Sequence, residues 1–194
     1  MARSANAGRT NQVRIIGGRW RSRKVSFPDG AGLRPTPDRV RETLFNWLQF
    51  DIAGRRCLDL FAGSGVLGLE ALSRGAGQLT VVDASRAALQ AINENLAALD
   101  AEDVQVIDSD ALSFLARAPA ETFDIVFLDP PYDSDLLPRA CGLLEQHNCL
   151  SNHARIYLET EAGRDDPADY APDSWTQLRS ARAGQVVYSL YEKG

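Results

Sequence analysis

The sequence predicts an α/β protein built around a mostly parallel sheet with helices on both faces. First, apolar strand-like runs alternate with stretches of helical spacing from residue 57 to residue 159. Second, the turn Gly63-x-Gly65-x-x-Gly68 follows an apolar run and opens a helical one. Third, a length of 194 residues with 44% hydrophobic and 24% charged residues fits one globular domain.

The N-terminal part is predicted to be a small basic unit in front of this sheet. Residues 1–12 are polar and are expected to form a flexible arm, whose role is left open. The alternation in residues 13–25, followed by the turn at 28–30, favours a small hairpin with cationic side chains on one face. A helix should follow up to about Phe50, with Thr36 or Asp38 as its cap. We therefore divide the chain into an arm (1–12), a basic hairpin and helix (13–50) and a sheet domain (51–194).

The remaining elements follow from the change between periods of 2 and 3.6 residues. Strands are predicted at Cys57–Phe61, Leu79–Asp83, Val104–Ile107, Phe123–Asp129, Ala154–Glu159, Trp175–Ser180 and Gln185–Tyr191. Helices are predicted at Val66–Ser73, Ser85–Leu99, Ala111–Ala116 and Asp135–His147. The last two strands have no helix between them, so they should form an antiparallel hairpin at the edge of the sheet.

Charge is divided unevenly along the chain. The net charge is −5, yet residues 1–56 hold twelve Arg or Lys against four Asp or Glu. A basic segment on an acidic body indicates an anionic partner, with a solvated basic tail as the alternative. No apolar run approaches a membrane span, and residues 1–11 lack the apolar core of a signal peptide. Three cysteines without CxxC spacing fit a reducing cytoplasm and match no zinc pattern, so we expect a cytoplasmic protein without a metal.

Two cofactors compete for the glycine loop. Asp83 stands 20 residues after Gly63, at the end of the next strand, where a carboxylate binds ribose hydroxyls. Asp59, four residues before Gly63, decides between NAD and S-adenosylmethionine. A carboxylate there would repel a pyrophosphate, whereas it would attract a sulfonium and an ammonium group. S-adenosylmethionine is therefore the favoured cofactor.

Further residues of this loop and of the next strand end complete the predicted cofactor site. Asp110, just past the third strand, is placed to accept from an adenine amino group, with the Ala111 backbone beside it. Alternatively, Asp110 only caps the following helix. The predicted cofactor-binding residues are Asp59, Phe61, Gly63, Ser64, Gly65, Asp83, Asp110 and Ala111.

A second motif follows the strand at 123–129. Asp129-Pro130-Pro131-Tyr132 removes two backbone donors and leaves acceptors at a strand's carboxyl end. Acceptors without donors suit an exocyclic NH2 group, and Tyr132 offers a ring for stacking on a base. Catalysis on such a poorly nucleophilic nitrogen would be mostly positioning and electrostatics. A rigid turn in which Asp129 acts as a cap is the structural alternative.

A base in folded nucleic acid must be splayed out to reach such a corner, which requires a surface that grips phosphates. Trp20 is a candidate for stacking, or else for packing the hairpin against the body. Arg39 or Arg41 is a candidate for RNA contact, or else for pairing with Glu42 or Asp38. The predicted RNA-binding residues are Arg14, Arg19, Trp20, Arg21, Arg23, Lys24, Arg39 and Arg41.

The motifs together resemble a known family. Residues 13–21 (VRIIGGRWR), 33–47 (LRPTPDRVRETLFNW), the Asp59 loop and DPPY resemble the bacterial RsmD-type methyltransferases. The resemblance runs from about Val13 to Glu192 and includes the ending AGQVVY at 183–188. The Ile-Ile-Gly-Gly and Arg-Pro-Thr segments are its specific part, because the glycine loop and DPPY occur in many amino-group methyltransferases.

The resemblance implies a Rossmann-like class I methyltransferase fold, a seven-stranded sheet whose last strand is antiparallel, and no metal. It implies an S-adenosylmethionine-dependent enzyme that methylates the N2 amino group of a guanine in 16S rRNA, presented on an assembled or partly assembled 30S subunit. Arg34 and Thr36, beside Pro35, are expected to close over the cofactor and the target base. A monomer suffices, and the sequence leaves open which guanine is modified and whether naked rRNA is a substrate.

Three other functions remain possible at this point. An amino-group methyltransferase acting on DNA adenine or a protein glutamine would use the same corner, but leaves residues 13–41 unexplained. An NAD-dependent oxidoreductase would use the glycine loop. A ribosome-assembly factor would keep the fold without turnover.

Overall fold

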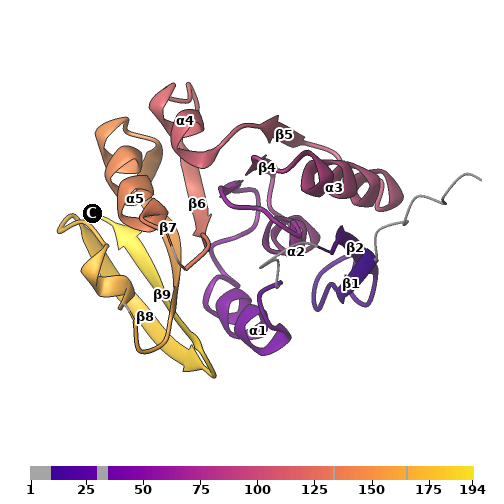
Figure 1. The fold of residues 1–194 in the computed structure, drawn as a ribbon, viewed down its shortest axis with the longest axis horizontal. Helices are drawn as coiled ribbons and strands as arrows, with labels where there is room; N and C mark the ends of the chain where they lie inside the picture. Colours follow the sequence, from indigo (N-terminus) through magenta and orange to yellow (C-terminus); the bar gives the residue numbers. More distant parts are fainter. Residues whose placement is uncertain (1–9, 30–34, 133, 165) are drawn as a thin grey trace, which may run out of the picture.

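The computed structural model describes residues 10–29, 35–132, 134–164 and 166–194 (Figure 1). Its centre is a seven-stranded sheet in the order β5-β4-β3-β6-β7-β9-β8. The strands are β3 (Arg56–Asp59), β4 (Gln78–Asp83), β5 (Val104–Asp108), β6 (Phe123–Leu128), β7 (Leu150–Glu161), β8 (Trp175–Ala183) and β9 (Val186–Lys193). Neighbours from β5 to β7 pair in parallel, as predicted.

The C-terminal hairpin lies at the edge of the sheet and its last strand is antiparallel, as predicted. Strand β9 pairs antiparallel with both β7 and β8, so it is inserted between them. The sheet therefore ends at β8, and the last strand is an interior one. Figure 1 shows the two strands running side by side along one flank of the molecule.

Two layers of side chains cover the two faces of the sheet, because successive strand residues point to opposite sides. On β6, Ile125 and Phe127 join one core cluster, whereas Val126 and Leu128 join the other. The first cluster packs under α1 (Asp38–Trp47), α2 (Val66–Ser73) and α3 (Arg86–Ala98). The second packs under α4 (Ala111–Ala116) and α5 (Leu136–Gln146). A short 3-10 helix, η1 (Pro167–Asp169), precedes β8.

The N-terminal hairpin is real, but its strands differ from the predicted ones. Strand β1 (Thr10–Arg14) pairs antiparallel with β2 (Lys24–Pro28), so residues 10–12 belong to a strand and not to the predicted arm. Residues 1–9 of that arm lie outside the described residues. Ile15, Trp20 and Val25 enter the same core cluster as α1 and the sheet, which fixes the hairpin to the body.

The start of α1 also departs from expectation. Its N-cap is Pro37, and no side chain caps it, so neither Thr36 nor Asp38 has the predicted capping role. Both side chains have other partners, described below. Among the helices of the described ranges, none combines the length and apolarity that a membrane crossing requires.

Candidate cofactor and nucleic-acid site

Three carboxylates end neighbouring strands at the carboxyl edge of the sheet. Asp59 closes β3 and Asp83 closes β4, and Asp129 follows β6. Strand β3 lies between β4 and β6, and Asp59 pairs in register with Val81 on one side and Phe127 on the other. Ligands bind at this edge in open parallel sheets, so the predicted cofactor and catalytic carboxylates are brought together.

The glycine loop crosses this edge between β3 and α2. Gly63 and Gly65 have φ values of 51° and 71°, a left-handed conformation that favours glycine. The Gly63 amide donates to Asp83 Oδ2 at 2.7 Å, and the Ser85 amide donates to Asp83 Oδ1 at 2.7 Å. Asp83 thus holds the loop in place, and each carboxylate oxygen keeps acceptor capacity for a further donor.

Gly68 explains why the third glycine is needed. A Cβ atom there would lie 2.9 Å from the Leu79 side chain and 3.1 Å from Asp59 Oδ2. The bare backbone lets α2 approach the sheet, so that the Gly68 amide donates to Asp59 Oδ2 at 2.9 Å. This is the close helix–strand packing expected of the third glycine in such loops.

Asp59 is a buried carboxyl group with one unused oxygen. The residue is 1% exposed, and its Oδ1 has no hydrogen-bond partner in the described part of the chain. Burial raises the pKa of Asp59 to about 7; the Gly68 amide opposes this shift, and the Asp83 charge adds to it. A buried acceptor without a partner is costly, and a cationic or donor group beside it would satisfy it.

Asp129 repeats this arrangement at the end of β6. Among the described residues its Oδ1 is buried without a hydrogen-bond partner, and its Oδ2 accepts from Thr36 Oγ1 at 3.5 Å. Burial raises the pKa of Asp129 well above its usual range, and the charges of Glu159 and Asp59 raise it further. Asp129 Oδ1 is therefore a free, desolvated oxygen, which supports the expected role of Asp129 as an acceptor beside two prolines.

Glu159 on β7 was missed by the sequence reasoning. It is 6% exposed and accepts from the Tyr132 hydroxyl and from the Tyr157 hydroxyl, each at 2.6 Å. This carboxylate ties Tyr132 of the DPPY corner to the sheet. The signal was a carboxylate at the end of an otherwise buried apolar strand, since a buried charge demands partners.

Asp110 shows the capping role that the sequence left open. It is exposed, and its Oδ1 accepts from the Ser113 amide at 2.9 Å at the start of α4. Its hydrogen bonds with Ser113 lower the pKa of Asp110. Contact with adenine stays a prediction, as do the cofactor contacts of Phe61, Ser64 and Ala111.

The basic residues separate into an exposed and a buried group. The exposed ones, which stay candidates for RNA contact, are Arg14, Arg19, Arg21, Arg23, Lys24 and Arg39. One of them, Arg23, also donates to the Ala98 carbonyl at the end of α3, at 2.8 Å. Arg34 lies outside the described residues.

The prediction that Trp20 stacks on a base is wrong. It is 7% exposed, and its backbone amide donates to Ser73 Oγ at 3.0 Å. The Arg19 guanidinium covers its ring at 4.2 Å from the ring centre. The ring belongs to the core that fixes the hairpin to the body, which was the alternative interpretation.

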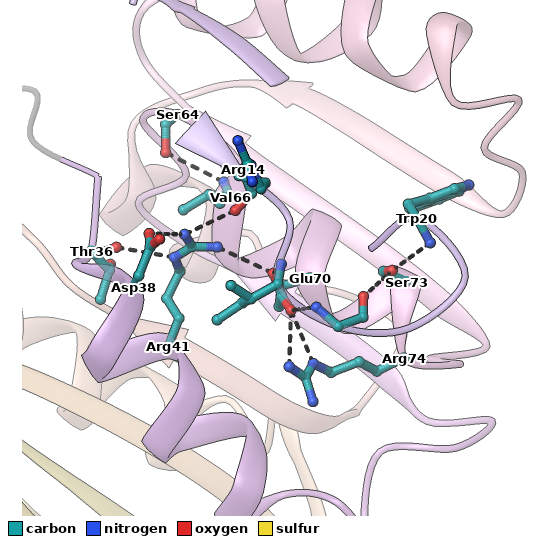
Figure 2. Close-up of polar contacts among 12 residues, drawn as sticks. Arg14, Trp20, Thr36, Asp38, Arg41, Ser64, Val66, Glu70, Ser73 and Arg74 are labelled. Carbon is teal, nitrogen blue, oxygen red and sulfur yellow. Dashed lines mark hydrogen bonds and ion pairs between the residues drawn. The ribbon is translucent and has the colours of Figure 1, made fainter. Parts of the chain in front are cut away.

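The prediction that Arg41 contacts RNA is wrong. It is fully buried, and its guanidinium donates to Glu70 on α2, to Asp38 and to two backbone carbonyls (Figure 2). The position of Arg41 on the predicted helix already indicated that it is buried. At about 100° per residue, Arg41 falls within the arc formed by the buried Val40, Leu44 and Phe45, whereas Arg39 lies on the opposite side.

Comparison with known proteins places these observations in a family. The family described as conserved hypothetical protein 95 matches residues 13–192. The chain is 48% identical to ribosomal RNA small subunit methyltransferase D of Escherichia coli, over 97% of this chain and 93% of that protein. It is 45% identical to the protein of the same name in Haemophilus influenzae, over 93% and 94%. The solved structure of the putative methyltransferase yhhF from Escherichia coli superposes with a TM-score of 0.87 at 47% identity, covering 94% of this chain and 98% of that one.

Proposed function

Since the chain belongs to the family described as conserved hypothetical protein 95, we propose that it methylates 16S rRNA. Curated relatives with which it aligns over nearly their whole length are named ribosomal RNA small subunit methyltransferase D. In this proposal the methyl donor is S-adenosylmethionine and the acceptor is the exocyclic N2 amino group of a guanine in the small subunit. The protein acts as a monomer in the cytoplasm.

The pair of unsatisfied carboxyl oxygens carries the proposal. Asp59 Oδ1 and Asp129 Oδ1 are buried at the ends of two adjacent strands, and no described residue hydrogen-bonds to either. One oxygen suits the cationic part of the donor, and the other suits the hydrogens of an amino group. The residues present therefore fit both S-adenosylmethionine and an amino-bearing base, whereas a pyrophosphate beside Asp59 would be repelled.

In this mechanism the chain orients the acceptor nitrogen. S-adenosylmethionine, when bound, supplies an electrophilic methyl group on a cationic sulfur. Asp129 Oδ1 and the carbonyl next to Pro130 accept hydrogen bonds from the N2 hydrogens, which aims the nitrogen lone pair at the methyl carbon. The N–C bond would form as the S–C bond breaks, and the nitrogen would then pass one hydrogen, as a proton, to the Asp129 carboxylate. Burial of Asp129 makes its hydrogen bonds stronger than they would be in water.

The substrate is brought to this corner by the hairpin. Arg14, Arg19 and Arg21 are exposed on it, and such residues bind phosphates without reading sequence. We propose that they hold 16S rRNA of the assembled or partly assembled 30S subunit while the target guanine is splayed out.

Mass spectrometry of 16S rRNA from a strain that lacks this protein tests the proposal. One N2-methylguanosine should be absent, and expression of the wild-type chain should restore it. Asp129→Ala should not restore it, although 30S binding persists, because the acceptor for the amino group is gone. Asp135→Ala, at an exposed residue of the same loop region, is the matched control and should restore the modification. An unchanged guanine methylation profile in the deletion strain would overturn the proposal.

A further inference from the structure

Arg41 joins three segments of the chain through one buried guanidinium. Nη2 donates to the Arg14 carbonyl at 3.0 Å, and Nε donates to the Thr36 carbonyl at 3.1 Å. Nη1 donates to Glu70 Oε2 at 3.1 Å, and Nη2 also reaches Asp38 Oδ1 at 2.5 Å. Figure 2 shows the guanidinium pointing between these partners, which belong to the hairpin, to α1 with its preceding segment, and to α2.

On the hairpin side, this guanidinium is part of a docking contact. Glu70 is fully buried and accepts from the Ile16 amide at 3.0 Å and the Gly17 amide at 2.8 Å. Ser73 Oγ donates to the Gly17 carbonyl at 2.5 Å. The exposed cations proposed to hold RNA precede and follow Ile16 and Gly17. A movement of the hairpin when RNA binds would therefore act directly on Glu70 and Arg41.

On the catalytic side, Arg41 holds the backbone of Thr36, which touches Asp129. Thr36 is 4% exposed, and its Oγ1 lies 3.5 Å from Asp129 Oδ2, at the long end for a hydrogen bond. Among the described residues, the Thr36 hydroxyl is the side-chain group that donates to the Asp129 carboxylate. A small movement of Thr36 therefore changes how the Asp129 carboxylate is aimed.

We infer that Arg41 is a positioning residue that couples RNA bound on the hairpin to the aim of Asp129. RNA contact fixes the positions of the Arg14 carbonyl and of Glu70, which both bind the guanidinium. The guanidinium in turn fixes the Thr36 backbone, and so the position of the Thr36 hydroxyl beside Asp129. The inference rests on the proposed function and adds to it a reason why methyl transfer depends on how the RNA is seated. Arg41 itself contacts neither RNA nor the reacting atoms.

Arg41→Lys is the main test variant. It keeps a positive charge beside Glu70 but loses the planar fork that serves several acceptors at once. If that variant does not fold, Arg41→Met combined with Glu70→Gln removes both buried charges together and takes its place. Arg55→Lys, at an exposed residue before β3, is the matched control and should behave as wild type.

A double-mutant cycle with Thr36→Val separates positioning from a general structural role. Single-turnover methyl transfer is measured on 30S subunits from a strain that lacks the protein, at saturating S-adenosylmethionine. We expect Thr36→Val to slow transfer about tenfold alone but less than about twofold when Arg41 is already Lys, because the coupling is then lost. The Kd for 30S subunits should change less than about twofold in Arg41→Lys. Independent, multiplying losses would overturn the inference.

Hydrogen exchange gives a readout that does not depend on methyl transfer. Binding of the same 30S subunits should slow amide exchange at residues 38–41 in wild type, but only at residues 13–25 in Arg41→Lys. Equal protection of 38–41 in both proteins, or none in wild type, would overturn the coupling. Failure of wild type to methylate 16S rRNA would instead overturn the proposed function, so the two failures are distinguishable.

Discussion

Asp59 and Asp129 each have a buried oxygen to which no described residue hydrogen-bonds. An unpaired buried acceptor costs about 1–3 kcal/mol, so the isolated protein is destabilised where it is ready to bind. Both groups also have raised pKa values, mainly because burial disfavours the charged carboxylate. Two pH effects follow at the scale of single residues.

The first effect concerns stability. The pKa of Asp59 is raised to about 7 in the folded protein, against about 3.9 in an unfolded chain. Its contribution to stability is therefore complete below pH 4 and is lost as the pH rises through 7. Denaturant unfolding without cofactor should show a fall in the free energy of unfolding from pH 4 to pH 8 that Asp59→Asn reduces by a few kcal/mol, on the order of the shift. The exposed Asp135→Asn should leave the pH dependence unchanged; the same slope in Asp59→Asn and wild type would contradict the prediction.

The second effect concerns the rate. In the proposed function, the ionised Asp129 carboxylate is a stronger acceptor for the amino group than the neutral acid and can take its proton, so methyl transfer should decline as the pH falls through the raised pKa of Asp129. The Glu159 charge contributes to that raised value, and Glu159→Gln should therefore move the acidic limb of the rate profile to lower pH. Single-turnover rates between pH 5 and 9 measure the shift. Glu161→Gln, on the same strand, is the control, and an acidic limb that stays in place in Glu159→Gln would count against the prediction.

At the scale of elements, the connection between β1 and β2 is shaped by its contact with α2. Gly18 has a φ of 74°, and a Cβ atom there would lie 1.8 Å from the Ser73 carbonyl oxygen. The Arg19 amide donates to that same carbonyl at 2.7 Å. The backbone of the Ile-Ile-Gly-Gly segment is thus pressed onto the end of α2, where a side chain does not fit.

Gly18→Ala should accordingly cost far more stability than a comparable glycine elsewhere. Gly184, with a φ of 62° and open space around its Cβ position, is the matched control. Gly184→Ala should lose about 1–2 kcal/mol from its left-handed backbone alone. Gly18→Ala adds an overpacking cost of about 1–3 kcal/mol, measurable by denaturant unfolding. Equal losses in the two variants would show that the contact with Ser73 is unimportant.

The elements that the sequence predicted well are those in which apolar residues recur at a clear helical or strand spacing. Helices α2 and α4 have the predicted bounds, and β6 and β8 begin where the apolar pattern begins. The cap of α1 and the interior place of β9 were not predictable in the same way. Both depend on tertiary contacts: the Thr36 hydroxyl points at Asp129, and β9 pairs with a strand that ends 25 residues before it.

The sequence also placed the residues of the predicted site unevenly. Asp59, Asp83 and Asp129 came from strand ends, because a parallel sheet gathers its carboxyl ends at one edge. Arg41 and Trp20 were misassigned because a count of basic residues and aromatics carries no information on which side of an element they face. Glu159 was missed because its role depends on Tyr132 and Tyr157, which only folding brings to it.

At the scale of the whole molecule, charge is segregated more cleanly than the net value of −5 suggests. With Arg41 buried, the exposed cations of the N-terminal unit stand mainly on the hairpin, away from α5 (Figure 1). Asp59, Asp83 and Asp129 stand where strands end, at the carboxyl edge of the sheet. In the proposed function the hairpin binds an anionic polymer, and this edge binds a small cationic ligand.

Binding to 30S subunits should therefore weaken steeply with salt. Removing one cation that binds a phosphate reduces the slope of log Kd against log salt by about one. Replacing Arg19, Arg21 and Arg23 by Glu should weaken 30S binding and flatten that slope, while calorimetry shows unchanged affinity for S-adenosylmethionine. Arg139→Glu, on α5, is the control for a change of net charge. Salt-independent binding, or an equal effect of Arg139→Glu, would contradict the prediction.

The interior position of β9 has a consequence for how this chain is made. Strand β8 is hydrogen-bonded into the sheet through β9 and has no other neighbouring strand there. During translation, β8 leaves the ribosome before the strand that must attach it to β7. The nascent chain therefore exposes the open edge of β7 until Val186–Lys193 has emerged from the exit tunnel. Completion of this sheet therefore waits for β9, and a chain that stops short of Val186 loses the pairing of β7 with β9 and of β8 with β9 at once.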